Sequence, residues 1–144
     1  MKPYLLDVMI TIDTNILVYL SLTTPETAQA EAVLALDPIW VAPPLWRSEL
    51  RNVLALYIRR DLLALDQAQQ IMADAERLMK NGDVVANSEH VLTLAAQSGC
   101  SAYDCEFVAV AQQMGVLLVT GDRELVKRFP AIAFSPQAFL SRTT

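Results

Sequence analysis

The sequence contains little histidine, cysteine or glycine, and each shortage argues against a class of site. His90 is the only histidine, so we expect neither a serine or cysteine triad nor a histidine-rich zinc site. Cys100 and Cys105 are the only cysteines. Two thiols at this spacing form neither a disulfide framework nor a CxxC pair, so we expect free thiols. The four glycines form neither a GxGxxG motif nor a P-loop, which argues against a glycine-rich nucleotide cradle.

Positive charge is also scarce. The net charge of −5 is the opposite of what a protein needs when it binds nucleic acid mainly through lysine and arginine. A phosphate-bearing substrate would therefore need local positive charge, from bound metal ions or from small basic groups. A solvated helix face is the ordinary role of such groups. The basic groups are Arg47/Arg51, Arg59/Arg60 and Lys127/Arg128.

Long apolar runs are missing as well. No run in the sequence approaches the ~20 residues of a membrane-spanning helix. The first seven residues lack the charged head and small-residue cleavage site of a signal peptide. We therefore expect a soluble, cytoplasmic protein.

The chain's apolar segments are short and regularly spaced. Its 144 residues and 53% hydrophobic content fit one domain, residues 1–144, with a sizeable core or a self-association surface. Strand-like runs alternate with helical patterns, and no hairpin dipeptide joins two runs. This alternation predicts an α/β fold, a three-layer α/β/α arrangement with a central parallel sheet of about five strands. The predicted strands are the run from Val8 that ends at Asp13, 39–42, 84–86, 116–119 and 131–134.

The first of these strands ends at a carboxylate. An apolar, β-branched run from Val8 reaches Asp13 and becomes helical at once, which places Asp13 at the carboxyl edge of a central strand. Open parallel sheets bind ligands along that edge. Taken alone, the stretch is better explained by Asp13 or Thr14 capping the helix that follows.

Three further acids fall at similar transitions, and each has an ordinary explanation. Asp104 shares a helix face with the apolar Phe107, but it can also form a capping box with Ser101. Glu49 lies near the start of the helix after the second strand, where a partly solvated glutamate is common. Asp122 directly follows the 116–119 strand, where it would cap the next helix.

These acids share a geometric consequence. Asp13, Glu49, Asp104 and Asp122 all fall along one edge of the predicted sheet. Like charges that converge in a partly buried cleft repel one another, so a hard divalent cation is their natural occupant. An all-oxygen ligand set fits Mg²⁺ or Mn²⁺ and gives no reason to expect zinc.

The same residues carry a family resemblance. In order, the chain has Asp13-Thr14-Asn15-Ile16-Leu17, Glu49 in a helix, Ser101-Ala102-Tyr103-Asp104 and Thr120-Gly121-Asp122. This series resembles the PIN-domain family and looks most like its VapC-type toxin ribonucleases.

The resemblance implies a metal site of Asp13, Glu49, Asp104 and Asp122, supported by Asn15 and Thr120. It also implies a central parallel sheet, a homodimer and a small antitoxin that inserts a segment near the site. Two features depart from the family pattern. Glu106 stands where the family usually has a small residue, and the segment before Asp13 is longer than usual.

The hypothesis is Mg²⁺- or Mn²⁺-dependent endonucleolytic cleavage of RNA, with the chain as the toxin of a type II toxin-antitoxin pair. Asp13, Asp104 and Asp122 are the candidate metal ligands, and Glu49 either binds metal or orients the attacking water. Asn15 and Thr120 would fix carboxylate orientation. One alternative is a PIN-like module that binds RNA or protein without catalysis. A receiver or haloacid-dehalogenase phosphotransfer domain is a weaker one, because the latter type needs an aspartate where Asn15 stands.

Overall fold

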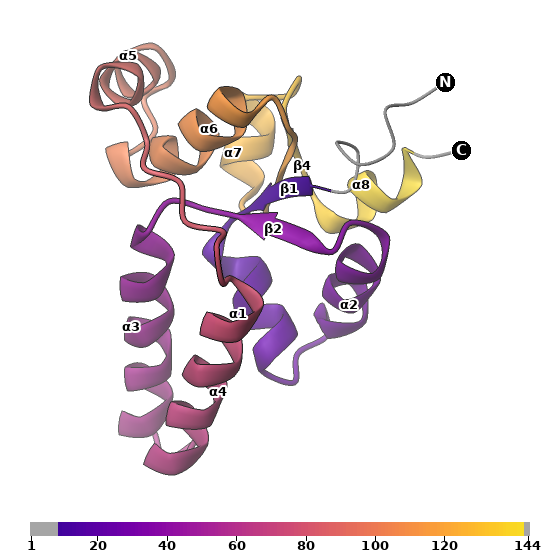
Figure 1. Cartoon of the computed structure of the whole chain (residues 1–144), viewed down its shortest axis with the longest axis vertical. Helices are drawn as coiled ribbons and strands as arrows, with labels where there is room; N and C mark the ends of the chain where they lie inside the picture. The colour runs from indigo at the N-terminus through magenta and orange to yellow at the C-terminus, as the bar shows by residue number, and fades with distance from the viewer. Residues whose placement is uncertain (1–8, 143–144) are drawn as a thin grey trace.

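A parallel four-stranded sheet forms the centre of the molecule (Figure 1), and the computed structural model describes residues 9–142. The strands are β1 (Met9–Ile12), β2 (Ile39–Val41), β3 (Leu118–Val119) and β4 (Ala133–Phe134), in the order β2-β1-β3-β4. β1 lies inside the sheet, where Thr11 is paired with both Val41 and Leu118. Its Ile10 and Ile12 are fully buried. The expectations for the first seven residues and for the long segment before Asp13 fall largely outside the described residues.

Helices flank this sheet, as the alternating pattern predicts. In Figure 1, α5, α6 and α7 lie above the strands, and α1, α3 and α4 lie below them. α6 packs against β1 and β3, whereas α1 packs against α2 and α3. The helices are α1 (Thr14–Ser21), α2 (Thr27–Leu36), α3 (Leu45–Arg59), α4 (Leu65–Leu78), α5 (Ser88–Ser98), α6 (Ala102–Met114), α7 (Arg123–Arg128) and α8 (Pro136–Ser141). None of the helices in residues 9–142 is long and apolar enough to cross a membrane.

The predicted strand at residues 84–86 is wrong. The sheet therefore has four strands, whereas the sequence predicts about five. The run Val84 to Ala86 forms no strand: an isolated bridge pairs the preceding residue, Asp83, with Ala42, and the Val84 N–H donates to the Ala42 carbonyl at 3.0 Å. Gln113 of α6 bonds this segment instead: its amide donates to the Val85 carbonyl at 3.2 Å and accepts from the Asn87 N–H at 2.8 Å. Val85 is 78% exposed, so the apolar run lacks the burial that a sheet strand requires.

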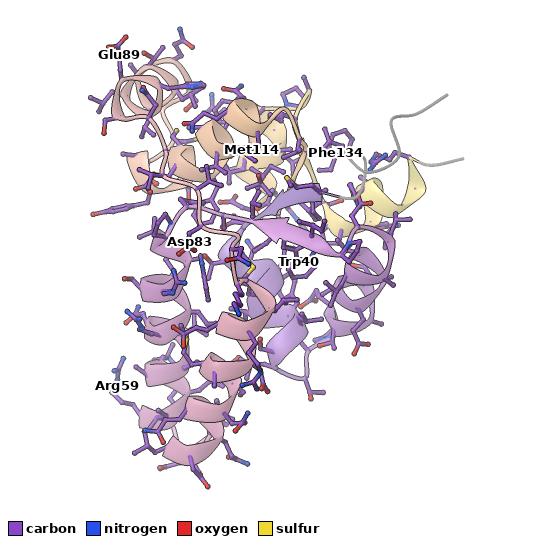
Figure 2. All side chains as sticks on the ribbon, viewed as in Figure 1. Trp40, Arg59, Asp83, Glu89, Met114 and Phe134 are labelled. Atoms are coloured by element: carbon purple, nitrogen blue, oxygen red, sulfur yellow. The ribbon has the colours of Figure 1, made fainter. Side chains whose placement is uncertain are left out.

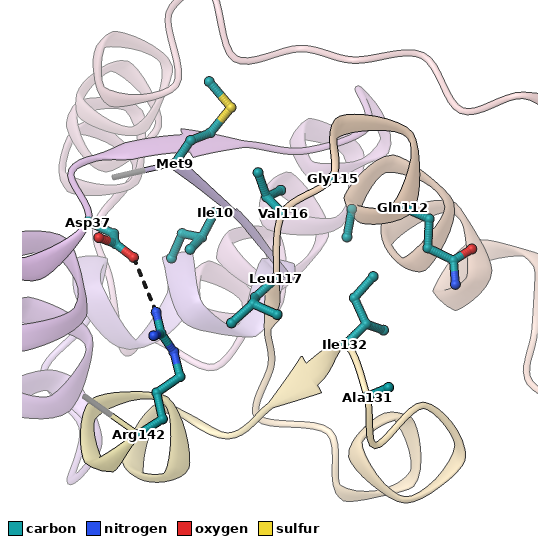
Figure 3. A pocket seen from close by; sticks show the side chains of 11 residues that line it. Met9, Ile10, Asp37, Gln112, Gly115, Val116, Leu117, Ala131, Ile132 and Arg142 are labelled. Carbon is teal, nitrogen blue, oxygen red and sulfur yellow. Dashed lines mark ion pairs between the residues drawn. The ribbon is translucent and has the colours of Figure 1, made fainter. Parts of the chain in front are cut away.

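The amino and carboxyl edges of the sheet differ. A hollow of about 530 Å³ opens at the amino edge, beside Met9, Leu117 and Ile132 (Figure 3). Arg142 lies 3.7 Å from the Asp37 carboxylate at its rim, which ties α8 to the end of α2. The predicted acids do not line this hollow, because they follow the strands and therefore lie at the opposite edge.

Candidate metal site at the carboxyl edge of the sheet

Asp13 lies between β1 and α1, and its side chain caps α1. The Asp13 N–H donates to the Val119 carbonyl at 3.0 Å, which extends the β1–β3 pairing to the last residue before α1. Its Oδ1 accepts the Thr14 N–H at 2.8 Å, so Asp13 is the N-cap of α1. The side chain is 8% exposed. A helix cap uses one carboxylate oxygen and leaves the second for other partners.

That second oxygen joins two loops. Asp13 Oδ2 accepts from Thr120 Oγ1 at 2.7 Å and from Asn15 Nδ2 at 3.4 Å. In return, Asn15 Oδ1 accepts the Gly121 N–H at 2.9 Å, and Thr120 Oγ1 accepts the Asp122 N–H at 3.0 Å. Asn15 and Thr120 thus hold the chain after β1 against the chain after β3. Their hydrogen bonds to Oδ2 are those that Asn15 and Thr120 need if they orient the Asp13 carboxylate.

The four predicted acids line one hollow of about 380 Å³, with Thr14, Asn15, Val18 and Val53. They reach it from separate elements: Asp13 between β1 and α1, Glu49 on α3, Asp104 on α6, and Asp122 between β3 and α7. Within residues 9–142, none of the four carboxylates forms an ion pair with a basic side chain. The hollow therefore gathers negative charge that the described part of the chain does not neutralise.

Local bonds fix three of these acids in place. Glu49 Oε1 accepts from Thr14 Oγ1 at 2.6 Å. Asp122 Oδ1 caps α7 through the Glu124 N–H at 2.8 Å. Ser101 Oγ caps α6 by accepting the Asp104 N–H at 3.1 Å, while the Asp104 side chain lines the hollow. The structure therefore contains both the helix caps and the shared hollow, so capping does not exclude a role in ligand binding.

The electrostatic environment disfavours charge on these carboxylates. Burial raises the pKa of Asp13 from 3.8 to about 6; the Thr120 and Thr14 hydrogen bonds lower it, and the charges of Glu49 and Asp104 raise it further. Burial is also the main cause of the raised pKa values of Glu49 and Asp104. The charge of Asp104 further raises the pKa of Glu49, and the charge of Asp122 further raises the pKa of Asp104. A bound cation would reverse this tendency, because it favours the ionised form of each ligand.

The donor set fits a hard divalent cation that keeps part of its water shell. All four side chains offer oxygen, and the hollow is open to solvent water. In the described residues, no three acidic, histidine or cysteine side chains are close enough to form a complete cage by themselves. Mg²⁺ ordinarily binds through one or two carboxylates together with several waters and substrate phosphate, so an open arrangement of acids suits it.

Other sequence candidates lie away from this hollow. Glu106 lines a neighbouring hollow of about 370 Å³ with Pro44, Val85 and Leu92. Its charge nevertheless contributes to the raised pKa of Glu49. His90 contacts Gln112 through its ring at 2.6 Å and does not line the acidic hollow. Cys100 and Cys105 are free, as expected.

Two members of the basic groups, Arg47 and Arg128, form ion pairs. Arg47 lies 2.6 Å from the Asp83 carboxylate, labelled in Figure 2, and 3.5 Å from that of Glu76. Arg128 pairs with Glu124 at 3.0 Å. Two residues near the site are not predicted from the sequence in the roles that the structure indicates. The sequence predicts Thr14 only as a cap, and it predicts no role for Arg123, which lines a hollow beyond Gly121.

Comparisons with known proteins agree with this geometry. Residues 10–132 match the family described as PIN domain. The curated protein ribonuclease VapC3 of Pyrobaculum aerophilum is 33% identical to this chain over 87 residues, which cover 58% of this chain and 66% of that protein. The crystal structure of PAE2754 from Pyrobaculum aerophilum matches with a TM-score of 0.74 and 22% identity, and covers 94% of this chain and 89% of that one. That likeness supports the fold, and the family match, which covers most of the residues described, shows that the chain belongs to the PIN-domain family.

Proposed function

We propose that this chain is a Mg²⁺- or Mn²⁺-dependent endoribonuclease. The observation that carries the proposal is the meeting of Asp13, Glu49, Asp104 and Asp122 around one hollow without a basic partner among the described residues. The name of the relative, ribonuclease VapC3, supports RNA as the substrate. Membership of the PIN-domain family supports a nuclease activity.

The side chains around the hollow would have different roles in the hydrolysis of a phosphodiester. Asp13, Asp104 and Asp122 would hold the cation directly or through its bound waters, and the bound cation would lower the pKa of a water and offset phosphate charge. Glu49 uses Oε1 to accept the Thr14 hydroxyl, so its Oε2 is the oxygen that can take a proton from the attacking water. Its raised pKa suits a general base better than that of an ordinary glutamate. Asn15 and Thr120 hold Asp13 in the orientation that the cation needs.

The test is RNA cleavage by wild type, Asp104→Asn and Glu89→Gln with Mg²⁺ or Mn²⁺, and with EDTA. Asp104→Asn keeps the side-chain shape and the Ser101 cap on its backbone N–H but removes a ligand charge. We expect loss of cleavage in this variant and in EDTA. Glu89, exposed on α5 (Figure 2), is the charge-matched control and should cleave normally. Normal cleavage by Asp104→Asn would show the assignment to be wrong, whereas tight Mn²⁺ binding without cleavage in wild type would favour a non-catalytic module.

We further propose that the protein is the toxin of a type II pair, acts as a homodimer and is neutralised by a small antitoxin protein. Large apolar side chains near the hollow of Glu106 support a protein-binding surface: Val85 is 78% exposed and Leu92 is 65% exposed. Light scattering after size exclusion would test the dimer. Growth arrest on expression in a bacterial host, relieved by Asp104→Asn, would test the toxin role, and a small reading frame upstream of the gene would identify the antitoxin.

A further inference from the structure

A second polar hollow lies against the same loop as the acids. It has a volume of about 390 Å³. Thr120 and Gly121 line it on one side, whereas Asp122, the next residue, lines the acidic hollow. The segment from Thr120 to Arg123 is therefore a wall shared by the two hollows. A chain molecule that extends from the acids across this wall enters the second hollow.

The two hollows carry opposite charge. No basic residue lines the acidic hollow, and no acidic residue of the described chain lines the second one. Arg123 is its only charged lining residue; it is exposed and forms no ion pair within residues 9–142. Its sequence neighbour Glu124 pairs with Arg128 at 3.0 Å instead. The Arg123 guanidinium is therefore available to an anionic group that enters this hollow from outside.

The remaining lining is mixed: the apolar Val126 and Pro136 lie beside polar side chains that can bind a nucleotide. Gln29 of α2 and Gln137 of α8 line the hollow, and neither side-chain amide has a hydrogen-bond partner among the described residues. A glutamine amide both donates and accepts, so it can bond the edge of an unstacked base. Arginine presents a planar set of N–H donors that matches a phosphate.

We propose that this hollow is the subsite for the nucleotide next to the scissile phosphate, and that Arg123 binds that nucleotide's phosphate. This inference rests on the proposed ribonuclease function, since the acidic hollow must hold the scissile phosphate. The shared wall from Thr120 to Arg123 favours RNA over an acidic peptide, because a single strand that passes over it meets the cation site and Arg123 in succession. Arg123 is thus a substrate-binding residue whose loss changes affinity more than turnover.

The experiment compares Arg123→Gln with Arg59→Gln, which removes the same charge from an exposed arginine at the far end of α3 (Figure 2). Each substitution is placed in active protein for kinetics and in the Asp104→Asn background for binding. The binding probe is a fluorescein-labelled single-stranded RNA of randomised sequence, followed by anisotropy over a range of salt concentrations. Mn²⁺ affinity and thermal melting are measured for each variant as checks on the site and the fold.

We expect Arg123→Gln to raise KM and the RNA dissociation constant about tenfold, as for the loss of one charge-assisted phosphate contact, with kcat and Mn²⁺ affinity unchanged. The slope of log affinity against log salt should fall by about 0.7, the value for one phosphate contact on a single strand. Arg59→Gln should change each quantity less than twofold, and Arg123→Lys should recover part of the affinity because it restores the charge.

Equal effects of Arg123→Gln and Arg59→Gln on RNA affinity would overturn the subsite, since only net charge would then matter. A loss of kcat without a change in KM would also overturn it. If wild type cuts no RNA, the proposed nuclease function is wrong. The anisotropy comparison still decides the subsite in that case, because it measures binding without turnover.

Discussion

Replacing Asp13 by asparagine should stabilise the metal-free protein at neutral pH. Asp13 is 8% exposed, and burial is the main reason that its pKa rises from 3.8 to about 6. One pKa unit corresponds to about 1.4 kcal/mol, so ionising this carboxyl in the folded protein costs about 3 kcal/mol above pH 6. Asparagine has the same shape and cannot ionise. It therefore removes this cost.

The substitution also has a smaller cost of its own. Asparagine caps a helix about as well as aspartate, so the bond from the Thr14 N–H to Oδ1 can persist. The new amide NH₂ faces the donors Thr120 Oγ1 and Asn15 Nδ2, so two hydrogen bonds are lost at about 1 kcal/mol each. The net gain in the free energy of unfolding is then about 1 kcal/mol at pH 7.5. For a domain of this size, that gain raises Tm by about 3 °C.

The sign should reverse with pH. The folded-state pKa is above the unfolded-state value, so the destabilising effect of ionisation is absent below about pH 4 and complete above about pH 6. At pH 4.5 about 1 kcal/mol of the benefit of Asp13→Asn remains, which is less than the cost of its two lost hydrogen bonds, so the variant should melt slightly below wild type. At pH 7.5 it should melt above wild type.

The assay is thermal melting in EDTA at both pH values, repeated with saturating Mn²⁺. Asp66→Asn, at an exposed first-turn position of α4, is the control and should change the free energy of unfolding by less than about 0.5 kcal/mol. Mn²⁺ at 100 times its dissociation constant should stabilise wild type by about 2.7 kcal/mol and the variant by less. A variant that is less stable than wild type to the same extent at both pH values would refute the argument from burial.

Two other substitutions test how the loops are joined. Thr120→Val removes the donor to Asp13 and the acceptor of the Asp122 N–H. We expect the free energy of unfolding, measured in urea, to fall by about 1 to 3 kcal/mol. Thr93→Val is the control and should change it little, because the exposed Thr93 hydroxyl bonds only its own helix. Gly121→Ala places a Cβ against the Tyr19 hydroxyl, so it should lower Tm and Mn²⁺ affinity, and adding Tyr19→Phe should restore part of both. Equal Mn²⁺ affinity in Gly121→Ala and wild type would mean that the contact with Tyr19 does not position the loop.

The fold was predictable where burial follows the sequence pattern. β1 and β3 are buried strands, and their apolar runs predict them. The run Val84 to Ala86 has the same composition, but Gln113 bonds its backbone, and a contact between residues so distant in the sequence has no local signal. The expected sheet was one strand too wide for this reason.

The site was predictable only as a set. Strand ends and helix starts place Asp13 and Asp122 at one edge, and the apolar face of α6 indicates that Asp104 points inward. The bond from Thr14 to Glu49 depends on how α1 packs against α3, which no local pattern reveals. Arg123 was missed for a related reason, because its role depends on the positions of α2 and α8 beside it.

Structural hydrogen bonds and the proposed metal binding are compatible at this site because a carboxylate has two oxygens. Asp122 holds α7 with Oδ1, and Glu49 holds the Thr14 hydroxyl with Oε1. In each case the structural bond fixes the side-chain orientation, and the other oxygen remains for a cation or a water. The capping bonds therefore supply the rigidity that a metal site needs. An acid at a strand-to-helix junction is for this reason weak evidence of function alone. Four acids from separate elements around one hollow are stronger evidence, because helix capping does not require them to meet.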